Sequence, residues 1–195
     1  MKKNKQFFSK NDFSRVWFKR SEIMHDLIYK NLGNDVLTAS EYGCGPYAPF
    51  YSSSPDNMSV FCFDQKKWDE KTICLNLNDI DSDTINDTDI AVLSGVIEYL
   101  YNFESLLEKL SLKHDYIVCS YAPFPEYRPT IRNLFSRKTK VDFVYKNISS
   151  RSRKNWVNHF DLKQFIDIVS NNAMILDVSL WEQHIILLCK FKKVK

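Results

Sequence analysis

Residues 36–48 have the sequence VLTASEYGCGPYA, in which an apolar stretch runs into two glycines one residue apart. The first part, 36–42, predicts a buried strand. Gly43 and Gly45 predict a tight turn in which a ligand can approach the main chain closely. The whole chain contains four glycines, and two of them stand in this turn. The match of Gly43 to Ala48 with G-x-G-x-x-A fits a dinucleotide-binding loop as well as a loop for another adenosine cofactor.

Short apolar strands alternate with helical segments along the rest of the chain. This predicts a parallel α/β sheet, because parallel strands need crossover connections. Further strands are expected at 59–64, 72–75, 89–94, 116–120, 174–180 and 185–191. Helices are expected at 12–32, at 102–112 behind Asn102, and from Asp161 onward. Only four residues separate the last two strands, so the last strand must run against the others. The expected fold is a Rossmann-like, mostly parallel seven-stranded sheet with an antiparallel last strand and helices on both faces.

Length and composition indicate a single globular domain over residues 1–195. The chain is 44% hydrophobic and 26% charged, and no apolar run approaches the roughly 18 residues of a membrane span. The five cysteines are odd in number and show no C-x-x-C spacing. This pattern favours reduced core residues in a cytoplasmic protein over a disulfide framework or a zinc site.

Positive charge is concentrated in residues 128–154, which carry nine basic side chains and one acid, a net charge of +8. The whole chain has a net charge of +3, so the remaining residues sum to −5. A solvated surface loop would explain this segment. A local field that attracts an anionic ligand, such as a phosphorylated sugar, a nucleotide-linked metabolite or RNA, would explain it equally.

Two carboxylates stand where the carboxyl edge of the sheet is expected. Asp64 ends the second strand about twenty residues after the glycines, where a carboxylate can accept hydrogen bonds from ribose hydroxyls. Asp79 follows the third strand, where it can take the exocyclic amine of an adenine, although the Asp-rich stretch 79–89 also suits a solvated loop. The stretch does not fit a calcium loop, because Thr84 and Ile90 stand where a glycine and a bidentate glutamate are needed.

Four motifs stand at the expected ends of the first four strands. They are Glu41-x-Gly43-x-Gly45, then Asp64, then Asn78-Asp79, then Leu93-Ser94-Gly95-Val96-Ile97-Glu98-Tyr99-Leu100. Together with the antiparallel C-terminal strand, they resemble class I S-adenosylmethionine-dependent methyltransferases of the small-molecule type. The resemblance covers residues 36–120 and 159–191. It implies an enzyme that uses S-adenosyl-L-methionine as its cofactor.

The resemblance also implies roles for individual residues in binding the cofactor. Glu41 and the main chain of Gly43, Cys44 and Gly45 would hold its methionine end. Asp64 would bind the ribose, and Asn78 and Asp79 the adenine, with Gln65 and Ile80 as further contacts. Ser94 and Gly95 would pass close to the sulfonium and the acceptor.

The same resemblance implies how the domain is organised around that site. Residues 1–33 would form a helical lid, in which Arg20 meets a carboxylate, and residues 121–158 an irregular acceptor-side segment. Two features depart from the family. Tyr47 stands where the third glycine usually is, and only seven residues separate Asp64 from the third strand, so the second helix is nearly missing.

The sequence gives fewer indications of what the methyl acceptor is. Residues 94–97 lack the Asn/Asp-Pro-Pro-aromatic motif of enzymes that methylate exocyclic amines of bases, and no Pro-Cys nucleophile ends the fourth or fifth strand. An oxygen or nitrogen of a small molecule, anionic or saccharide, is therefore the expected acceptor. His159 and His184 are expected at the carboxyl edge, where an imidazole that titrates near neutrality can act as a general base. His159 would equally suit a helix cap, and His184 a hairpin.

Two other functions fit part of the sequence. A nicotinamide-dependent oxidoreductase would explain the G-x-G-x-x-A match, but the terminal hairpin and Glu41 two residues before the first glycine speak against it. A non-catalytic module on the same fold that binds nucleic acid or a partner would explain the +8 segment. The leading hypothesis is a cytoplasmic methyltransferase with a small-molecule acceptor.

Overall fold

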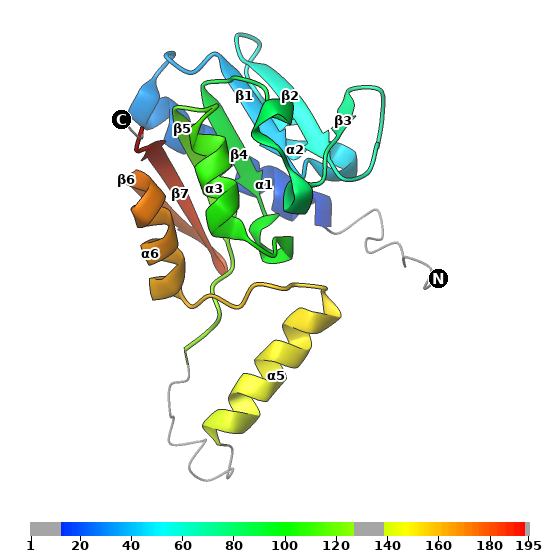
Figure 1. Ribbon diagram of the computed structural model, residues 1–195, viewed down its shortest axis with the longest axis vertical. Coiled ribbons are helices and arrows are strands. Elements are labelled where there is room, and N and C mark those ends of the chain that lie inside the picture. Colours follow the sequence, from blue (N-terminus) through cyan, green and yellow to red (C-terminus); the bar gives the residue numbers. More distant parts are fainter. Residues whose placement is uncertain (1–12, 127–138, 194–195) are drawn as a thin grey trace.

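A computed structural model describes residues 13–126 and 139–193, in which one mixed sheet carries helices on both of its faces (Figure 1). Its seven strands are β1 (Thr38–Tyr42), β2 (Ser59–Asp64), β3 (Thr72–Cys74), β4 (Ile90–Ser94), β5 (Tyr116–Tyr121), β6 (Ala173–Trp181) and β7 (His184–Phe191). The α-helices of the described residues are α1 (Phe13–Leu32), α2 (Pro49–Ser53), α3 (Phe103–Ser111), α5 (Lys140–Arg153) and α6 (Leu162–Asn172). Short 3₁₀ helices are η1 (Gly45–Tyr47), η2 (Leu77–Asp79), η3 (Ser82–Thr84) and η4 (Ile97–Tyr99).

The strand order is β3-β2-β1-β4-β5-β7-β6. Strands β1 to β5 are parallel to one another, whereas β7 is antiparallel to both β5 and β6. The carboxyl ends of β1, β2, β4 and β5 therefore meet at one edge of the sheet, which we call the carboxyl edge. The β6–β7 hairpin turns at the same edge, because Tyr121 at the end of β5 pairs with Ile185. This arrangement confirms the expected Rossmann-like sheet with its antiparallel last strand.

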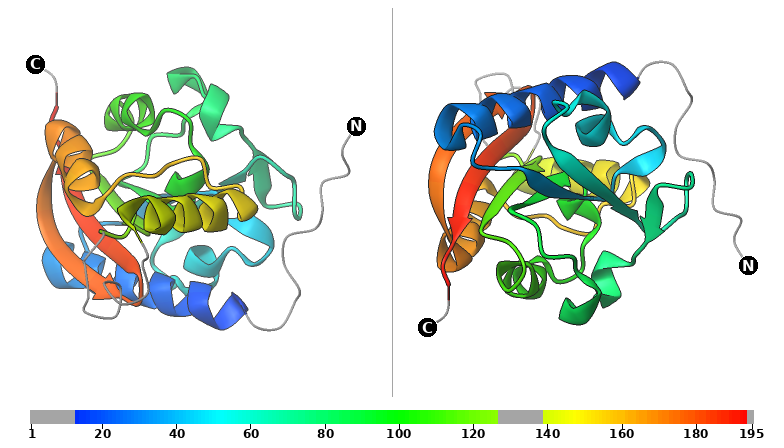
Figure 2. Two further views of the ribbon diagram at one scale, coloured as in Figure 1. Left: turned by 90° about the horizontal axis from the view of Figure 1, so that it is seen from below. Right: turned by 90° about the horizontal axis from the view of Figure 1, so that it is seen from above.

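Each face of the sheet is covered by its own pair of helices, and Figure 2 shows α1 and α2 opposite α3 and α6. The first cluster joins Met24, Leu27, Ile28 and Phe50 to Ala39, Val92, Val118, Ile186 and Leu188. The second joins Phe103, Leu106, Leu107, Leu110, Phe165 and Val169 to Leu93, Ile117, Cys119 and Leu187. Neighbouring residues of β4 and β5 thus enter opposite clusters. This explains why these strands are continuously apolar in sequence.

A polar network is buried near the amino-terminal ends of β4 and β5, away from the carboxyl edge. His114, only 1% exposed, lies 3.0 Å through Nε2 from the Tyr42 hydroxyl and 2.9 Å through Nδ1 from the Thr88 hydroxyl. The Thr88 hydroxyl in turn lies 3.1 Å from that of Ser40. Burial lowers the pKa of His114 to about 4. The network therefore joins β1 to the segments before β4 and β5 with a neutral imidazole at its centre.

Local sequence signals set the starts of two helices as expected. The Asn102 side chain accepts a hydrogen bond from Ser105 N (3.1 Å) at α3, and Asp161 with Gln164 forms a complete capping box at α6. The near absence of a second crossover helix is also confirmed, because residues 65–71 between β2 and β3 contain no helix.

Two sequence expectations were wrong. Residues 121–158, expected to be irregular, contain α5, which Thr139 and Asp142 start with a reciprocal capping box. Cys74, expected in the core, is exposed, because the short strand β3 stands at the edge of the sheet. Residues 128–138 of the basic segment, with four of its basic residues, lie outside the described residues.

Helix α5 lies beyond the carboxyl edge, apart from the sheet and from the other helices (Figure 1). Val141 and Tyr145 are each 75% exposed on it, whereas Arg151 in its last turn is buried. The helix therefore joins the rest of the protein through its C-terminal end. Neither α5 nor any other helix in the described ranges has the length and apolar character that crossing a membrane requires.

The buried His114 predicts a pH dependence of stability. Between about pH 6.5 and pH 4 the unfolded chain binds a proton at His114 that the native chain excludes, so the free energy of unfolding falls as pH falls. The loss attributable to His114 is up to about 3 kcal/mol. Urea unfolding of the wild type and of His114→Gln at several pH values measures it, because all other titrating groups are common to both proteins. Equal pH slopes in the two proteins would contradict the prediction.

Candidate functional site

The glycine turn after β1 packs against the loops after β2 and β4. The amides of Gly43 and Cys44 both donate to the carbonyl of Phe63, at 2.7 and 3.1 Å. Gly43 has a φ of 73°, and a Cβ there would lie 2.6 Å from a methyl group of Val96. Only glycine fits this close approach, which brings the ends of β1, β2 and β4 together at the carboxyl edge.

Glu41, at 1% exposure, anchors α2 behind this turn. Its two carboxylate oxygens accept hydrogen bonds from the amides of Phe50 (3.1 Å) and Tyr51 (3.0 Å). Burial raises the pKa of Glu41 to about 7, although the two amides and the charge of Arg20 oppose the rise. Each carboxylate oxygen has a second lone pair, so Glu41 keeps the capacity to accept a further hydrogen bond.

Asp64 closes the turn from the side of β2. Its Oδ2 accepts a hydrogen bond from Gly45 N and its Oδ1 one from Lys66 N, both at 3.0 Å. Asp64 also lines an open pocket of about 70 Å³. The other lining residues are Gly43, Gln65, Leu75, Asn76, Leu77 and Asn78. The structure thus brings the expected ribose-binding carboxylate and part of the glycine turn to one hollow.

The three residues expected at the adenine are placed differently from one another. Asn78 lines the pocket, but its amide ties two loops together: Nδ2 donates to the carbonyl of Tyr99 (3.2 Å) and Oδ1 accepts from Tyr101 N (2.7 Å). Asp79 is exposed. Ile80 is buried in the core, and its carbonyl accepts a hydrogen bond from a lysine of α3. Of the three, Asn78 alone lines the hollow.

Helix α1 brings a buried guanidinium to the end of β4. Arg20, 6% exposed, donates from Nε to the Ser94 hydroxyl (2.9 Å) and from Nη2 to the Ser94 carbonyl (3.2 Å). Gly95 has a φ of 69°, and a Cβ there would lie 2.6 Å from both terminal nitrogens of Arg20. One turn earlier, the ring of Trp17 lies 6.0 Å from that of Tyr47. The helical part of the expected lid therefore covers both the glycine turn and the end of β4.

Glu98 joins the loop after β4 to the segment that follows α5. Its Oε1 accepts from Ala122 N (2.9 Å), and its carbonyl accepts from Val157 N (2.7 Å) and Asn158 N (3.2 Å). Its Oε2 is buried and has no hydrogen-bond partner among the described residues. Burial raises the pKa of Glu98, opposed by the charges of Arg20 and Arg151 among others.

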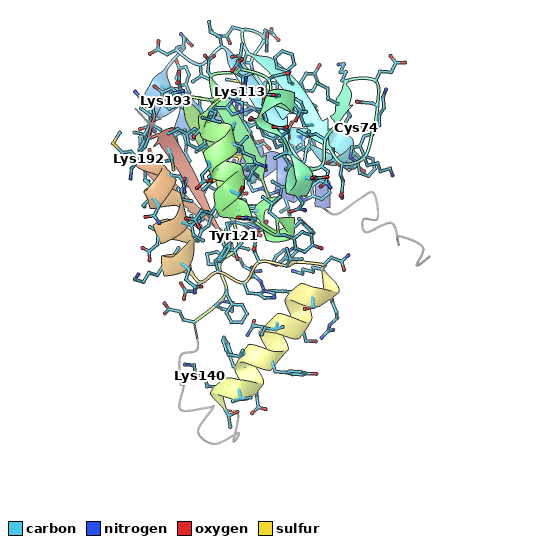
Figure 3. All side chains as sticks on the ribbon, viewed as in Figure 1. Cys74, Lys113, Tyr121, Lys140, Lys192 and Lys193 are labelled. Atoms are coloured by element: carbon cyan, nitrogen blue, oxygen red, sulfur yellow. The ribbon has the colours of Figure 1, made fainter. Side chains whose placement is uncertain are left out.

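Arg151 binds the same segments, those around Ala122 and Asn158, from the last turn of α5. Its guanidinium donates to the Tyr121 hydroxyl (3.0 Å) and to the carbonyls of Ala122 (2.9 Å), Pro123 (3.3 Å) and Asn158 (3.1 Å). Figure 3 shows Tyr121 where the body of the protein meets the segments that lead to α5. The segment 121–158 is thus held at both of its ends at the carboxyl edge.

The two candidate general bases both lie at this edge. The Nδ1 atoms of His159 and His184 are buried, and neither has a hydrogen-bond partner within the described ranges. Burial and the charges of Arg20 and Lys154 lower the pKa of His184 to about 4, and its ring lies 6.1 Å from that of Trp181. Burial and the charge of Arg151 lower the pKa of His159. Both imidazoles are neutral near pH 7. Arg20, which is bonded to Ser94 at the end of β4, is close enough for its charge to act on His184.

Sequence reasoning missed the roles of Glu98 and Arg151. Glu98 stands inside the motif that follows β4, but nothing in the motif shows that its carboxylate is buried. Arg151 counted as one of nine surface charges, and no spacing in the sequence distinguishes it from Arg153 or Lys154, which are exposed. Both roles depend on contacts between distant segments.

Known proteins share this fold at low sequence identity. No protein-family model matches the chain, and no curated protein sequence matches it. The N-terminal domain of EvdMO1 with S-adenosylhomocysteine (SAH) bound has a TM-score of 0.62 and 10% identity, over 94% of this chain and 86% of that chain. The plantazolicin methyltransferase BpumL in complex with SAH has a TM-score of 0.61 and 12% identity, over 93% and 86%.

A third similar structure is the Burkholderia thailandensis 1,6-didemethyltoxoflavin-N1-methyltransferase with bound 1,6-didemethyltoxoflavin and SAH. Its TM-score is 0.60 at 10% identity, over 92% of this chain and 81% of that chain. The chain therefore has the class I methyltransferase fold that its sequence motifs indicate.

The close approach of Arg20 to Gly95 predicts a stability difference between two glycine substitutions. Gly33→Ala is the control, because Gly33 has a φ of 60° with nothing within 4 Å of an added Cβ. It is expected to lose only the roughly 1–2 kcal/mol of a left-handed alanine. Gly95→Ala adds the displacement of the Arg20 guanidinium, about 1–3 kcal/mol more. Urea unfolding measures both, and equal losses would show that Arg20 does not constrain position 95.

Proposed function

We propose that the chain is a cytoplasmic methyltransferase that transfers the methyl group of S-adenosyl-L-methionine to an oxygen or nitrogen of a small molecule. The observation that carries the proposal is the meeting of the glycine turn, Asp64 and the Ser94–Gly95 corner at one edge of a sheet with the class I methyltransferase fold. Three proteins with similar structures have SAH bound.

The residues at the carboxyl edge fit the parts of this cofactor. The amides of Gly43, Cys44 and Gly45 already donate within the protein, so the turn would offer its carbonyl groups, with Glu41, to the methionine ammonium. The methionine carboxylate needs a cation, and Arg20 is the buried arginine at the end of β4, whereas the buried Arg151 donates to Tyr121 and to main-chain carbonyls. With this assignment, the ammonium and the carboxylate of the methionine end are each bound by groups of complementary charge.

The nucleoside end of the cofactor would occupy the hollow beside β2. Asp64 has acceptor capacity beyond its two amide bonds for the ribose hydroxyls, with Gln65 beside it. Asn78, Asp79 and Ile80 would flank the adenine. Because the Asn78 side chain is committed to the loop after η4, its main chain is the part that would contact the base.

The chemistry requires that the acceptor be positioned and, for a hydroxyl acceptor, that a proton be removed. S-adenosyl-L-methionine supplies a methyl group activated by its positively charged sulfur. His184 lies at the carboxyl edge and is neutral near pH 7, so its imidazole would accept the proton of the acceptor. His159 is the second candidate, in contact with Phe124 and under the charge of Arg151.

A non-catalytic nucleic-acid module is the second candidate function. Helix α5 favours it, because Lys140, Lys146 and Arg153 are exposed on a helix that stands away from the sheet. Binding by such a module would weaken steeply with salt, since it depends on phosphate contacts.

Cofactor binding is testable by calorimetric titration with S-adenosyl-L-methionine, SAH and NAD. We expect the two adenosyl compounds to bind and Asp64→Ala to weaken them by about 10- to 100-fold, the effect of losing hydrogen bonds to a charged group. Asp56→Ala, an exposed aspartate before β2, is the control and should leave affinity unchanged. Binding of NAD alone would make the protein an oxidoreductase, and binding of none would favour the non-catalytic module.

The role of His184 is testable by transfer of labelled methyl groups to an ultrafiltrate of cell extract that excludes protein and nucleic acid. His184→Gln is expected to slow the transfer by about 10²- to 10⁴-fold, the contribution typical of a general base, while SAH affinity stays unchanged. His159→Gln is the matched comparison and should retain the transfer. The reverse pattern would assign the base to His159. No transfer to the ultrafiltrate, with label found instead in the RNA of the unfractionated extract, would contradict a small-molecule acceptor.

A further inference from the structure

Four separate segments place side chains around the end of β4. They contribute Arg20 from α1, Tyr99 from η4, Lys154 and Trp156 from the segment after α5, and His184 from the start of β7. We call these five side chains the edge ring. Its members differ from the residues that surround the hollow beside β2, which belongs to the nucleoside end of the proposed cofactor.

Backbone register brings these segments together. Ser94 pairs with Ser120 across β4 and β5, and Tyr121 pairs with Ile185 across β5 and β7. His184 therefore stands at the same edge as Ser94, two strands away. The hydrogen bond from Val157 N to the carbonyl of Glu98 (2.7 Å) brings the segment after α5 against η4 in the same way.

Side-chain contacts connect the members of the edge ring to one another. Burial raises the pKa of Tyr99 and the Trp156 side chain beside it opposes that rise, while Lys154 Nζ lies 4.5 Å from the centroid of the Trp156 ring. The charges of Lys154 and Arg20 both act on His184, and the charge of Arg20 also acts on Tyr99. Contacts and charge interactions thus connect all four segments of the edge ring.

The edge ring has a distinctive chemical composition, with two aromatic faces, two cations and a neutral imidazole. Glu41 and Glu98 are buried beside Arg20 and offset its charge. Lys154 is exposed and forms an ion pair with no carboxylate of the described residues, so its charge is available to a ligand. Tyr99 is 36% exposed, so its ring remains accessible. The half-buried Trp156 ring instead carries Lys154 Nζ at 4.5 Å and the Arg151 guanidinium at 4.8 Å from its centroid.

We propose that the edge ring binds the acceptor, and that the acceptor is a planar aromatic or heteroaromatic molecule with an anionic group and a hydroxyl or amino group. This inference rests on the proposed methyltransferase function. The exposed ring face of Tyr99 stacks on a planar acceptor, and the ring of Trp156 holds Lys154 beside it. Lys154 pairs with its anionic group, and His184 accepts the proton of the group that is methylated. A cationic acceptor is repelled by Lys154.

Three probes test this class by calorimetry on the protein saturated with SAH. The first is 1-hydroxy-2-naphthoate, which has both the aromatic face and the carboxylate. The others are 1-naphthol, without the carboxylate, and 2-hydroxycyclohexanecarboxylate, without the aromatic face. We expect the naphthoate to bind at least about tenfold more tightly than either comparison compound. No binding of the naphthoate, or equal binding of all three probes, would overturn the proposal.

Variants locate the binding at the edge ring. Lys154→Met and Trp156→Leu are expected to weaken naphthoate binding by about tenfold, whereas Trp156→Phe, which keeps an aromatic face, retains most of it. Lys140→Met is the control, because Lys140 lies at the far end of α5 (Figure 3). An equal loss in Lys140→Met and Lys154→Met would show non-specific charge attraction and would overturn the assignment.

Two further measurements separate this inference from its alternatives. Each variant is titrated with SAH alone, so that loss of naphthoate binding with normal SAH binding is specific to the edge ring. Failure of the wild type to bind SAH would instead contradict the proposed function, whatever the naphthoate does. Displacement of the naphthoate by a single-stranded RNA oligomer at low salt, reversed by added salt, would assign the edge ring to nucleic acid and overturn a small-molecule acceptor.

Discussion

The contact between the Arg20 guanidinium and Ser94 ties the N-terminal helix to the end of the central strand. A buried positive charge is stable only when its donors are used and counter-charges lie near, and Ser94, Glu41 and Glu98 provide both. The contact leaves no room for a Cβ at Gly95. It also places a positive charge beside His184, which helps to keep that imidazole neutral. The position of helix α1 and the conformation of the corner after β4 therefore depend on one side chain.

Glu98 and Arg151 form a second anchor, and the two anchors meet because Glu98 feels the charges of both arginines. This anchor explains how a segment with little apolar sequence keeps a defined place at the carboxyl edge. A helix as short as α5 is marginal in water on its own. Its capping box and the buried Arg151 stabilise its two ends, so the segment after α5 can present Lys154 and Trp156 beside η4.

The sequence predicted the sheet because strands buried on both faces have to be continuously apolar, and because a four-residue connection forces an antiparallel pair. It predicted the caps at Asn102 and Asp161 because capping is local. It did not predict α5, although Thr139 and Asp142 have the spacing of a capping box, since an apolar stripe of few residues gives a weak periodic signal. The partners of Arg20 and Arg151 were out of reach for a physical reason. Arg20 donates to Ser94, 74 residues away, and Arg151 donates to Tyr121, 30 residues away.

The sequence departs from the pattern of class I methyltransferases at Tyr47 and in the short connection after Asp64. Different local contacts compensate for each departure. Tyr47 turns its ring towards Trp17, and the strained left-handed backbone falls on Ala48 instead, with a φ of 39°. With α2 only five residues long and no helix at 65–71, the loops of the carboxyl edge are held by Glu41, Asp64 and Asn78 bonded to main-chain groups. Glu41 and Asp64 also stand where the cofactor is proposed to bind. The proposal therefore couples the order of these loops to the affinity for the cofactor, because the same two carboxylates would serve both.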